Sequence, residues 1–339
     1  MTERSRGKNK LSLKKNQETG KPLFYTRLCR LLDIEYPIIQ GALGGIGGPD
    51  LAAAVSNAGG LGVLAAWGLS LEQLRRAIQK TRELTNRPFA VNIMPLSPQY
   101  SRSRADLVVE EKISIVTTGR GDPREPIVQS LKDQGIKVLG VVPTVRHALR
   151  LEGEGVDALV ASGCEAGGHV GRVGTMPLIP QVVDAVKVPV IAAGGIMDAR
   201  GLLAALSLGA CGIQMGTRFV ATEESAASPR EKERILAAGD EDNVVTELFT
   251  GKPVRVLTSP PLNRLLQEMQ QGLSLEEARS CLMELRKKKR GKDSEFNSLA
   301  SGQGAGLIHR IVPAAEVIRE IIEGAETLYR SLDPEYLSR

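Results

Sequence analysis

The sequence is poor in the residues that usually build metal sites, disulfide frameworks and nucleic-acid stacking surfaces. Its 339 residues include 4 cysteines, 3 histidines and only 3% aromatic residues. The cysteines are far apart and form no C-x-x-C pair, so we expect neither a disulfide framework nor a metal site. The scarcity of aromatic side chains argues against a surface that stacks on single-stranded nucleic acid. We therefore expect no nucleic-acid partner.

Long apolar runs are also missing. No stretch of about 18 consecutive apolar residues occurs, so we expect no membrane-spanning helix. The first residues lack the apolar segment of a secretory signal. Together with the unpaired cysteines, these absences favour a cytoplasmic protein. The pattern G-x-x-x-x-G-K-[ST] is absent as well, which argues against a nucleoside triphosphatase.

The net charge of +5 belongs to one end of the chain. Residues 1–22 carry seven basic and two acidic side chains, and the rest of the chain carries 37 of each sign. We expect residues 1–22 to form a disordered basic tail. The remaining body is neutral, and its 42% apolar content is sufficient for one large α/β barrel or two smaller domains.

Eight short apolar runs recur along this body with helix-like segments between them. Because the runs are continuously apolar rather than alternating, they are typical of parallel strands covered on both faces. Eight such units predict a closed (β/α)8 TIM barrel, with a doubly wound open sheet as the alternative. The predicted strands are Pro37–Gln40, Gly62–Ala65, Phe89–Ile93, Ile113–Thr117, Val138–Val142, Ala158–Ala161, Val190–Ala193 and Gly212–Met215.

The segment after the eighth strand has a different composition. Residues 222–296 are charged and predicted to be mostly helical, with Leu265–Arg290 as one long amphipathic stretch. We expect this insertion to cover the barrel mouth, and the barrel itself to comprise 23–221 and 297–339. Helices are also predicted at Leu71–Leu84, Pro126–Gln134, Thr144–Leu151, Pro180–Val186, Ala199–Leu208 and 314–331.

The most informative stretch is Glu165-Ala166-Gly167-Gly168-His169, which follows the predicted sixth strand. Histidine changes its charge near neutral pH, and glycines permit a close backbone approach to a ligand. Because such barrels build their active sites at the carboxyl ends of their strands, His169 is a candidate for proton chemistry. The alternative is a tight turn with a bystander histidine. His147 and His309 fall outside strand ends and are expected to be structural or exposed.

Two glycine-containing turns follow the predicted seventh and eighth strands. They are Gly194-Gly195 and Gly216-Thr217, which is where barrels of this kind commonly bind phosphate. Exposed backbone N–H groups, a helix N-terminus and the threonine hydroxyl would all favour an anion. Ordinary tight turns are the alternative. A phosphate site alone would also suit a sugar-phosphate isomerase or synthase that holds no flavin.

At the level of whole motifs, the chain resembles the flavin-dependent nitronate monooxygenase family, formerly called 2-nitropropane dioxygenases, and its relative enoyl-ACP reductase II. The resemblance runs from about Thr26 to Leu328. The motifs that carry it are Tyr36–Gly41, Ala52–Gly62, Val91–Ile93, Glu165–His169, Ile191–Ile196, Gln214–Phe219 and Ser301–Gln303.

The resemblance implies FMN at the barrel mouth. It places the phosphate on the two glycine turns already described and His169 in the position of the family's catalytic histidine. Many family members carry glutamine where this chain has Ser162, so that contact departs from the common pattern. The residues implied to bind the cofactor are Asn92, Ser162, Gly167, Gly194, Gly195, Gln214, Met215, Gly216 and Thr217.

Two reactions follow from the resemblance. In the monooxygenase, the histidine takes a proton from the carbon that bears the nitro group, and O2 completes the conversion to a carbonyl compound and nitrite. In the reductase, NAD(P)H reduces the flavin and an enoyl thioester on acyl carrier protein accepts the hydride. An NAD(P)H:quinone reductase is a third member of the same class. A homodimer is compatible with any of these.

Local segments divide between the two leading reactions. Thr117–Pro123 and the short Gly171–Met176 are similar to the reductase, whereas the glycine-rich Ala42–Ile46 is similar to the monooxygenases. We expect a nitronate monooxygenase with a small-molecule substrate and O2, and keep the reductase as the alternative.

Overall fold

The computed structural model describes residues 20–119, 127–288 and 297–332. Several sequence predictions therefore fall partly outside the described residues. They are the basic tail up to residue 19, the part of the strand-four loop from 120 to 123, the first residue of the helix predicted at Pro126–Gln134, the last two residues of the stretch predicted at Leu265–Arg290, the end of the insertion up to residue 296, and the barrel segment after residue 332.

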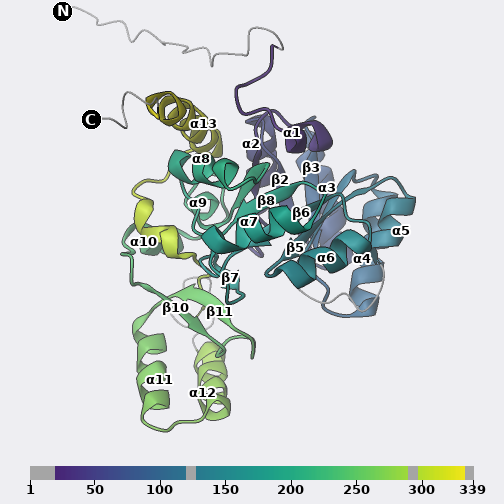
Figure 1. The fold of residues 1–339 in the computed structure, drawn as a ribbon. Coiled ribbons are helices and arrows are strands. Elements are labelled where there is room, and N and C mark those ends of the chain that lie inside the picture. The colour runs from purple at the N-terminus through teal and green to yellow at the C-terminus, as the bar shows by residue number, and fades with distance from the viewer. Residues whose placement is uncertain (1–19, 120–126, 289–296, 333–339) are drawn as a thin grey trace, which may run out of the picture.

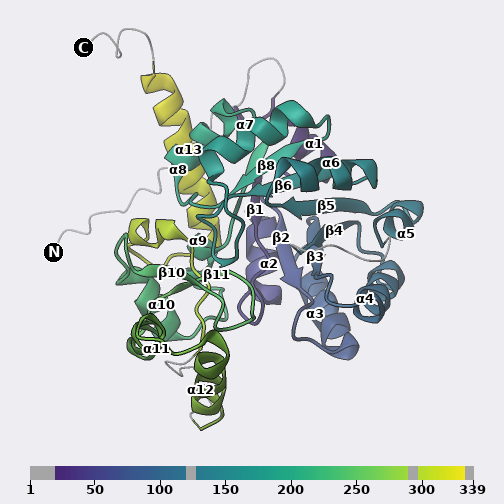
Figure 2. The ribbon, with the colours of Figure 1, turned by 60° about the horizontal axis from the view of Figure 1, so that its bottom comes forward.

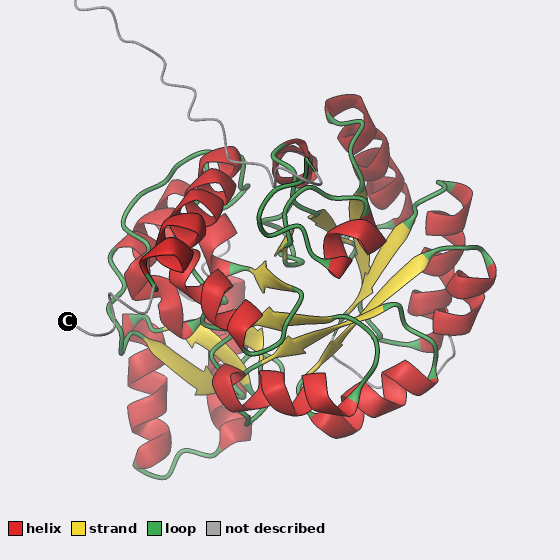
Figure 3. Cartoon of the chain, turned by 45° about the horizontal axis from the view of Figure 1, so that its top comes forward, coloured by secondary structure: helices red, strands yellow, loops and turns green. Residues whose placement is uncertain are grey.

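Eight parallel strands form the centre of the molecule in the order β1-β9-β8-β6-β5-β4-β3-β2. The outermost strands meet, because Gln40 N donates to Leu61 O and Leu61 N donates to Ile38 O, both at 2.9 Å. This closure confirms the (β/α)8 barrel and excludes the open sheet (Figures 1 and 3). The strands are β1 (Ile38–Gln40), β2 (Gly62–Ala65), β3 (Phe89–Ile93), β4 (Ile115–Thr118), β5 (Lys137–Val142), β6 (Ala158–Ser162), β8 (Val190–Ala193) and β9 (Gly212–Met215).

Helices follow the strands and form an outer layer around them (Figure 3). Several begin at the caps expected from the sequence, such as Ser70, whose hydroxyl accepts from Gln73 N in a capping box. Among the described helices, none is both long and apolar enough to cross a bilayer. The outer helices are α2 (Pro49–Asn57), α3 (Leu71–Leu84), α4 (Pro98–Glu110), α5 (Ile127–Asp133), α6 (Val145–Gly153), α7 (Thr175–Ala185), α8 (Ala199–Ser207), α9 (Thr217–Val220) and α13 (Ala314–Ser331).

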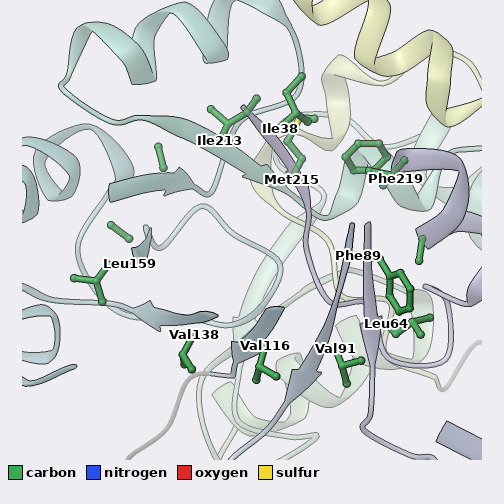
Figure 4. Close-up of a cluster of buried hydrophobic side chains, with 14 of the residues drawn as sticks. Ile38, Leu64, Phe89, Val91, Val116, Val138, Leu159, Ile213, Met215 and Phe219 are labelled. Atoms are coloured by element: carbon green, nitrogen blue, oxygen red, sulfur yellow. The ribbon is translucent and has the colours of Figure 1, made fainter. Parts of the chain in front are cut away.

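The core has two layers because neighbouring residues of a strand point to opposite faces. Side chains such as Ile38, Val91 and Val116 pack outward in the larger cluster of buried side chains (Figure 4). Side chains such as Ile39 belong to the second cluster inside the barrel. Helix α1 (Arg27–Leu32) contributes fully buried leucines to that inner cluster and so closes the end of the barrel where the strands begin.

Two predicted elements begin two or more residues away from their observed starts, and each difference has a local cause. Helix α7 begins at Thr175 rather than at Pro180, because the Glu165 side chain accepts a hydrogen bond from Thr175 N and caps the helix from outside. Strand β4 begins at Ile115 rather than at Ile113. Ile113 N instead donates to Val108 O at 2.9 Å and belongs to the turn that ends helix α4.

The insertion contains strands that the sequence reading missed. Strands β10 (Asn243–Thr246) and β11 (Val254–Leu257) pair antiparallel, and β11 also pairs with a two-residue strand, β7 (Gly168–His169). The predicted stretch Leu265–Arg290 is divided between two helices at Gly272, which has φ +110°. Helices α11 and α12 extend away from the barrel in Figure 1, where β10 and β11 lie between them and β7, and Figure 2 shows α12 pointing away from the barrel in a second view. The helices of the insertion are α10 (Pro229–Leu236), α11 (Pro260–Gln270) and α12 (Leu275–Lys288), and the 3-10 turn η1 (Gln303–Leu307) follows it.

Candidate active site

A cleft of about 300 Å³ opens at the carboxyl ends of the barrel strands. Its lining combines glycine turns, a few amides and hydroxyls, and apolar side chains. The structure brings all the residues predicted from the sequence into the lining of this one cleft, namely Asn92, Ser162, Gly167, His169, Gly194, Gly195, Gln214, Met215, Gly216 and Thr217.

His169 is the sole ionisable side chain among the described residues that line this cleft. It is half-buried in strand β7, where Gly168 adopts φ +79°, a conformation that favours glycine. Strand β11 holds its backbone: Val254 lies opposite His169 in the ladder, and Val170 N donates to Pro253 O at 3.1 Å. The imidazole Nε2 lies 3.1 Å from Thr250 Oγ1. The insertion therefore fixes both the backbone and the ring of this histidine.

The turn before His169 is tied to the barrel by Glu165. Its carboxylate oxygens accept from Thr175 N at 2.8 and 2.9 Å and from the Thr175 hydroxyl at 3.0 Å. The backbone oxygen of Glu165 accepts from Gln303 N at 2.9 Å. Charge-assisted hydrogen bonds of this kind hold a loop more firmly than neutral ones.

Asn92 presents a buried amide at the floor of the cleft. Its Nδ2 donates to Thr117 O at 3.2 Å and to Thr117 Oγ1 at 2.9 Å, and the side chain is 5% exposed. With Nδ2 engaged in this way, Oδ1 is oriented as an acceptor for a ligand N–H. This arrangement is compatible with the cofactor contact expected for Asn92.

The two glycine turns form one side of the cleft. Gly194 and Gly195 have φ +103° and +73°. A Cβ on Gly216 would meet only Leu43 Cδ2, at 3.5 Å, so it would occupy the cleft itself. Thr217 Oγ1 accepts from Gly302 N at 2.9 Å, which leaves the hydroxyl proton for a ligand oxygen. A phosphate-bearing ligand therefore fits this side of the cleft.

The other two histidines, and the cysteine that precedes His169 by five residues, are not part of the cleft lining. The Thr144 hydroxyl caps helix α6 by accepting from His147 N, and His147 Nδ1 lies 2.6 Å from the same oxygen. His309 lies beside helix α13 in a separate pocket. Burial raises the pKa of the Cys164 thiol, and the neighbouring Glu165 charge raises that pKa further, so Cys164 is a poor nucleophile. Within the described part of the chain, no group of three or more metal-ligating side chains could hold a metal ion.

Sequence reasoning missed Thr250. It is 81 residues from His169, and its insertion loop carries no motif that would link it to the sixth strand. Only the pairing of β7 with β11 brings the two side chains together.

The molecule is a parallel barrel with a cleft at the carboxyl ends of its strands. One turn of this cleft carries an ionisable side chain, and two glycine turns suited to phosphate form one of its sides. These features define the class of (β/α)8-barrel enzymes.

Comparison with known proteins identifies the family within that class. A family model described as "Nitronate monooxygenase" matches residues 25–103 and 95–324, and the chain belongs to this family. This match confirms the family resemblance found in the sequence. Members of the family are flavin-dependent oxidoreductases, so the alternative of a sugar-phosphate isomerase or synthase without a flavin is excluded.

Individual relatives cover most of the chain. A probable nitronate monooxygenase of Staphylococcus saprophyticus is 34% identical over 89% of this chain and 98% of the relative. The (3aS,4S,5R,7aS)-5-hydroxy-7a-methyl-1-oxo-octahydro-1H-indene-4-carboxyl-CoA dehydrogenase of Rhodococcus jostii is 40% identical over 71% of this chain and 67% of the relative. The structure of FabK from Thermotoga maritima superimposes with a TM-score of 0.84 at 40% identity, covering 91% of this chain and 98% of FabK.

Proposed function

We propose that the chain is an FMN-dependent nitronate monooxygenase that converts alkyl nitronates and O2 into carbonyl compounds and nitrite. The observation that carries the proposal is the lone imidazole of His169 among the described residues of the cleft. A general base needs a pKa near the working pH, and imidazole meets that requirement without a large shift. Membership of the nitronate monooxygenase family supports the same reaction.

The cleft residues fit FMN as the flavin. The two glycine turns and the Thr217 hydroxyl would hold its phosphate, because a side chain at Gly216 would fill that space. When bound, the flavin supplies reversible electron transfer, which amino-acid side chains do not offer. The residues that would surround its ring are Asn92, Ser162, Gly167, Gln214 and Met215.

The protein's own contribution is to handle a proton and exclude water. His169 would take the proton from the carbon that bears the nitro group, and the electron pair of the broken C–H bond would move into the nitro group. Apolar side chains in the cleft lining, including Leu43, Val141 and Ile196, would keep water from the reacting atoms.

Replacement of the histidine tests this proposal. We expect His169→Ala to retain the yellow flavin and to lose oxidation of nitroalkanes that must first be deprotonated. His309→Ala is the matched control, because His309 does not line the cleft, and it should keep both properties. Unchanged nitroalkane turnover in His169→Ala would overturn the assignment of the base.

An FMN-dependent enoyl reductase that uses NAD(P)H is the second candidate. It is favoured by 40% identity to FabK over 91% of the chain, and by a relative whose named substrate is a coenzyme A thioester. In that reaction His169 would protonate or orient a thioester, and acyl carrier protein would be the expected carrier. The cleft offers the same base and the same phosphate turns for both reactions.

Anaerobic mixing separates the two candidates. We expect a nitronate to change the flavin absorbance and NAD(P)H to leave it unchanged. Rapid bleaching by NADH or NADPH, followed by consumption of an enoyl thioester, would overturn the monooxygenase and establish the reductase.

A further inference from the structure

The Thr250 hydroxyl is surrounded by three polar contacts. Its Oγ1 lies 3.1 Å from His169 Nε2, 3.2 Å from Lys252 O and 3.3 Å from Lys252 N. Thr250 belongs to the insertion, in the turn between β10 and β11, so it reaches the histidine from outside the barrel.

Counting hydrogens assigns a direction to each contact. Lys252 N–H can only donate and Lys252 O can only accept, whereas the hydroxyl has one proton to give. Lys252 O, 3.2 Å away, can be satisfied by the hydroxyl only if it receives that proton. All three contacts are then satisfied only if the ring donates from Nε2–H to Thr250 Oγ1. Donation by the hydroxyl to Nε2 would deprive Lys252 O of its hydrogen.

We infer that Thr250 is a positioning residue that holds His169 as the Nε2–H tautomer, so that Nδ1 is the nitrogen that gains and loses the catalytic proton. This inference rests on the proposed role of His169 as the base. In both charge states Nε2–H donates to the same oxygen, so the ring keeps its orientation while Nδ1 is protonated and deprotonated.

The turn that carries Thr250 is itself held in place. Gly251 N donates to Glu247 O at 2.8 Å, and Gly251 adopts φ +72°. The ladder between β7 and β11 fixes the other side of the contact through Val254 and His169. The hydroxyl is therefore presented by a defined backbone at both ends, which is what a positioning group requires.

Several charged side chains of the described residues lie on the elements that pack against the histidine. On its own turn, the Glu165 carboxylate is bonded to Thr175. On β11, Arg255 Nε donates to Cys164 O at 3.0 Å. Lys252 and Glu247 belong to the Thr250 turn, and Arg172 follows the histidine along the chain. A titration of His169 must be interpreted with these groups unchanged, which requires an isosteric substitution at Thr250.

Nuclear magnetic resonance of histidine-labelled holoenzyme tests the tautomer directly. The chain has only 3 histidines, so His147→Gln and His309→Gln assign the three ring signals. We expect the nitrogen shifts of neutral His169 to show protonated Nε2 and unprotonated Nδ1. A neutral ring protonated at Nδ1 would overturn the inference, whatever reaction the enzyme catalyses.

Thr250→Val removes the hydroxyl while keeping the shape of the side chain. Because the hydroxyl stabilises the imidazolium more than the neutral ring, its loss should lower the His169 pKa by about half a unit to one unit. The acidic limb of the kcat/KM profile should move to lower pH by the same amount, and its plateau should fall about tenfold because the ring is less well oriented. Thr250→Ser should restore both.

Thr246→Val is the matched control. It removes the same group from the same insertion, where Thr246 Oγ1 accepts from Leu248 N and is buried on β10. A merely structural effect would lower the plateau in both variants without moving the acidic limb. If Thr250→Val leaves the His169 pKa unchanged, the inference fails. If that pKa moves but no nitronate or thioester is turned over, the proposed function fails instead.

Discussion

The Glu165 carboxylate accepts hydrogen bonds from the backbone N–H of Thr175, the first residue of helix α7, with oxygen-to-nitrogen distances of 2.8 and 2.9 Å. Glu165 lies four residues before His169, so this contact fixes where the turn that carries His169 leaves the barrel. The Thr175 hydroxyl lies 3.0 Å from Glu165 Oε2 and 2.9 Å from Gly194 O, and it has one proton for these two acceptors. Thr175 therefore lies between the turn that carries His169 and the turn that contains Gly194.

We predict that Glu165→Gln weakens catalysis as well as stability. An amide retains one acceptor oxygen but loses the charge, which should lower the free energy of unfolding by about 1–2 kcal/mol. The freed turn should lower kcat while flavin content stays near that of the wild type. Thermal unfolding and steady-state turnover of the same preparation would measure the two effects.

Glu152→Gln is the control for that prediction. The Glu152 carboxylate accepts from Lys187 N at 2.6 Å and from Val188 N at 3.1 Å, just before β8 begins. Like Glu165, this carboxylate holds a loop through backbone N–H groups, but it does so at the opposite end of the barrel from the cleft. We expect a similar loss of stability with unchanged kcat. Equal loss of kcat in both variants would contradict a specific role for Glu165.

Gly216→Ala should separate flavin binding from folding. The new methyl group would be 3.5 Å from Leu43 Cδ2, an ordinary contact, and the backbone φ of −106° suits any residue. We expect the flavin-free protein to unfold at the wild-type temperature, and FMN to bind about tenfold more weakly, a loss of about 1.4 kcal/mol. Titration followed by flavin fluorescence checks the affinity.

Gly62→Ala provides the contrast. Its methyl group would lie 1.9 Å from Ala52 O, inside the backbone of helix α2, so the fold itself must shift. Overpacking of this kind should cost about 3 kcal/mol of stability. If Gly216→Ala lowered the stability of the flavin-free protein as much as Gly62→Ala does, glycine at position 216 would be required for folding rather than for FMN binding.

Replacement of Glu326 should raise the stability of the protein by an amount that depends on pH. It is 8% exposed on helix α13, and burial raises its pKa, although the nearby Arg330 opposes that shift. Its Oε1 has no hydrogen-bond partner in the described chain. A carboxyl whose pKa rises on folding costs no stability when both states are protonated. The cost grows as the pH rises above the pKa of the unfolded state and is complete above the pKa of the folded state.

We therefore expect Glu326→Gln to raise the free energy of unfolding at pH 8, by on the order of 1 kcal/mol. The gain should vanish below the ordinary carboxyl pKa of 4.5. Denaturant unfolding of both proteins at pH 4 and pH 8 makes the variant its own control. A gain of equal size at both values would point to packing rather than to the buried charge.

Much of the barrel could be predicted because each strand and its following turn are encoded locally. A continuous apolar run such as Val190–Ala193 marks a strand covered on both faces, and the glycines after it mark the turn. Once eight strands are placed in order, their carboxyl ends must meet, so the cleft lining follows from counting. This is why His169, Gly194 and Gly216 could be grouped before any coordinates.

The remainder depends on contacts between distant segments. Strand β7 has two residues, too few for any periodic signal, and exists only because β11 pairs with it. The start of helix α7 was misplaced because its cap comes from Glu165, ten residues upstream, rather than from the residue before it. The role of Thr250 could not be predicted from the sequence either, because only the pairing of β7 with β11 brings it close to His169.

The seam between β7 and β11 has a consequence for how the protein responds to heat. Only two residue pairs join these strands, whereas the barrel strands are each secured on both sides. Segments with so few shared contacts open locally at a lower free-energy cost than the core. Val170 N, which donates to Pro253 O, should exchange its hydrogen faster than the amides of β8. We therefore expect warming to break the pairing between β7 and β11 before the barrel unfolds. The enzyme should then lose its activity reversibly at temperatures where the barrel is still folded.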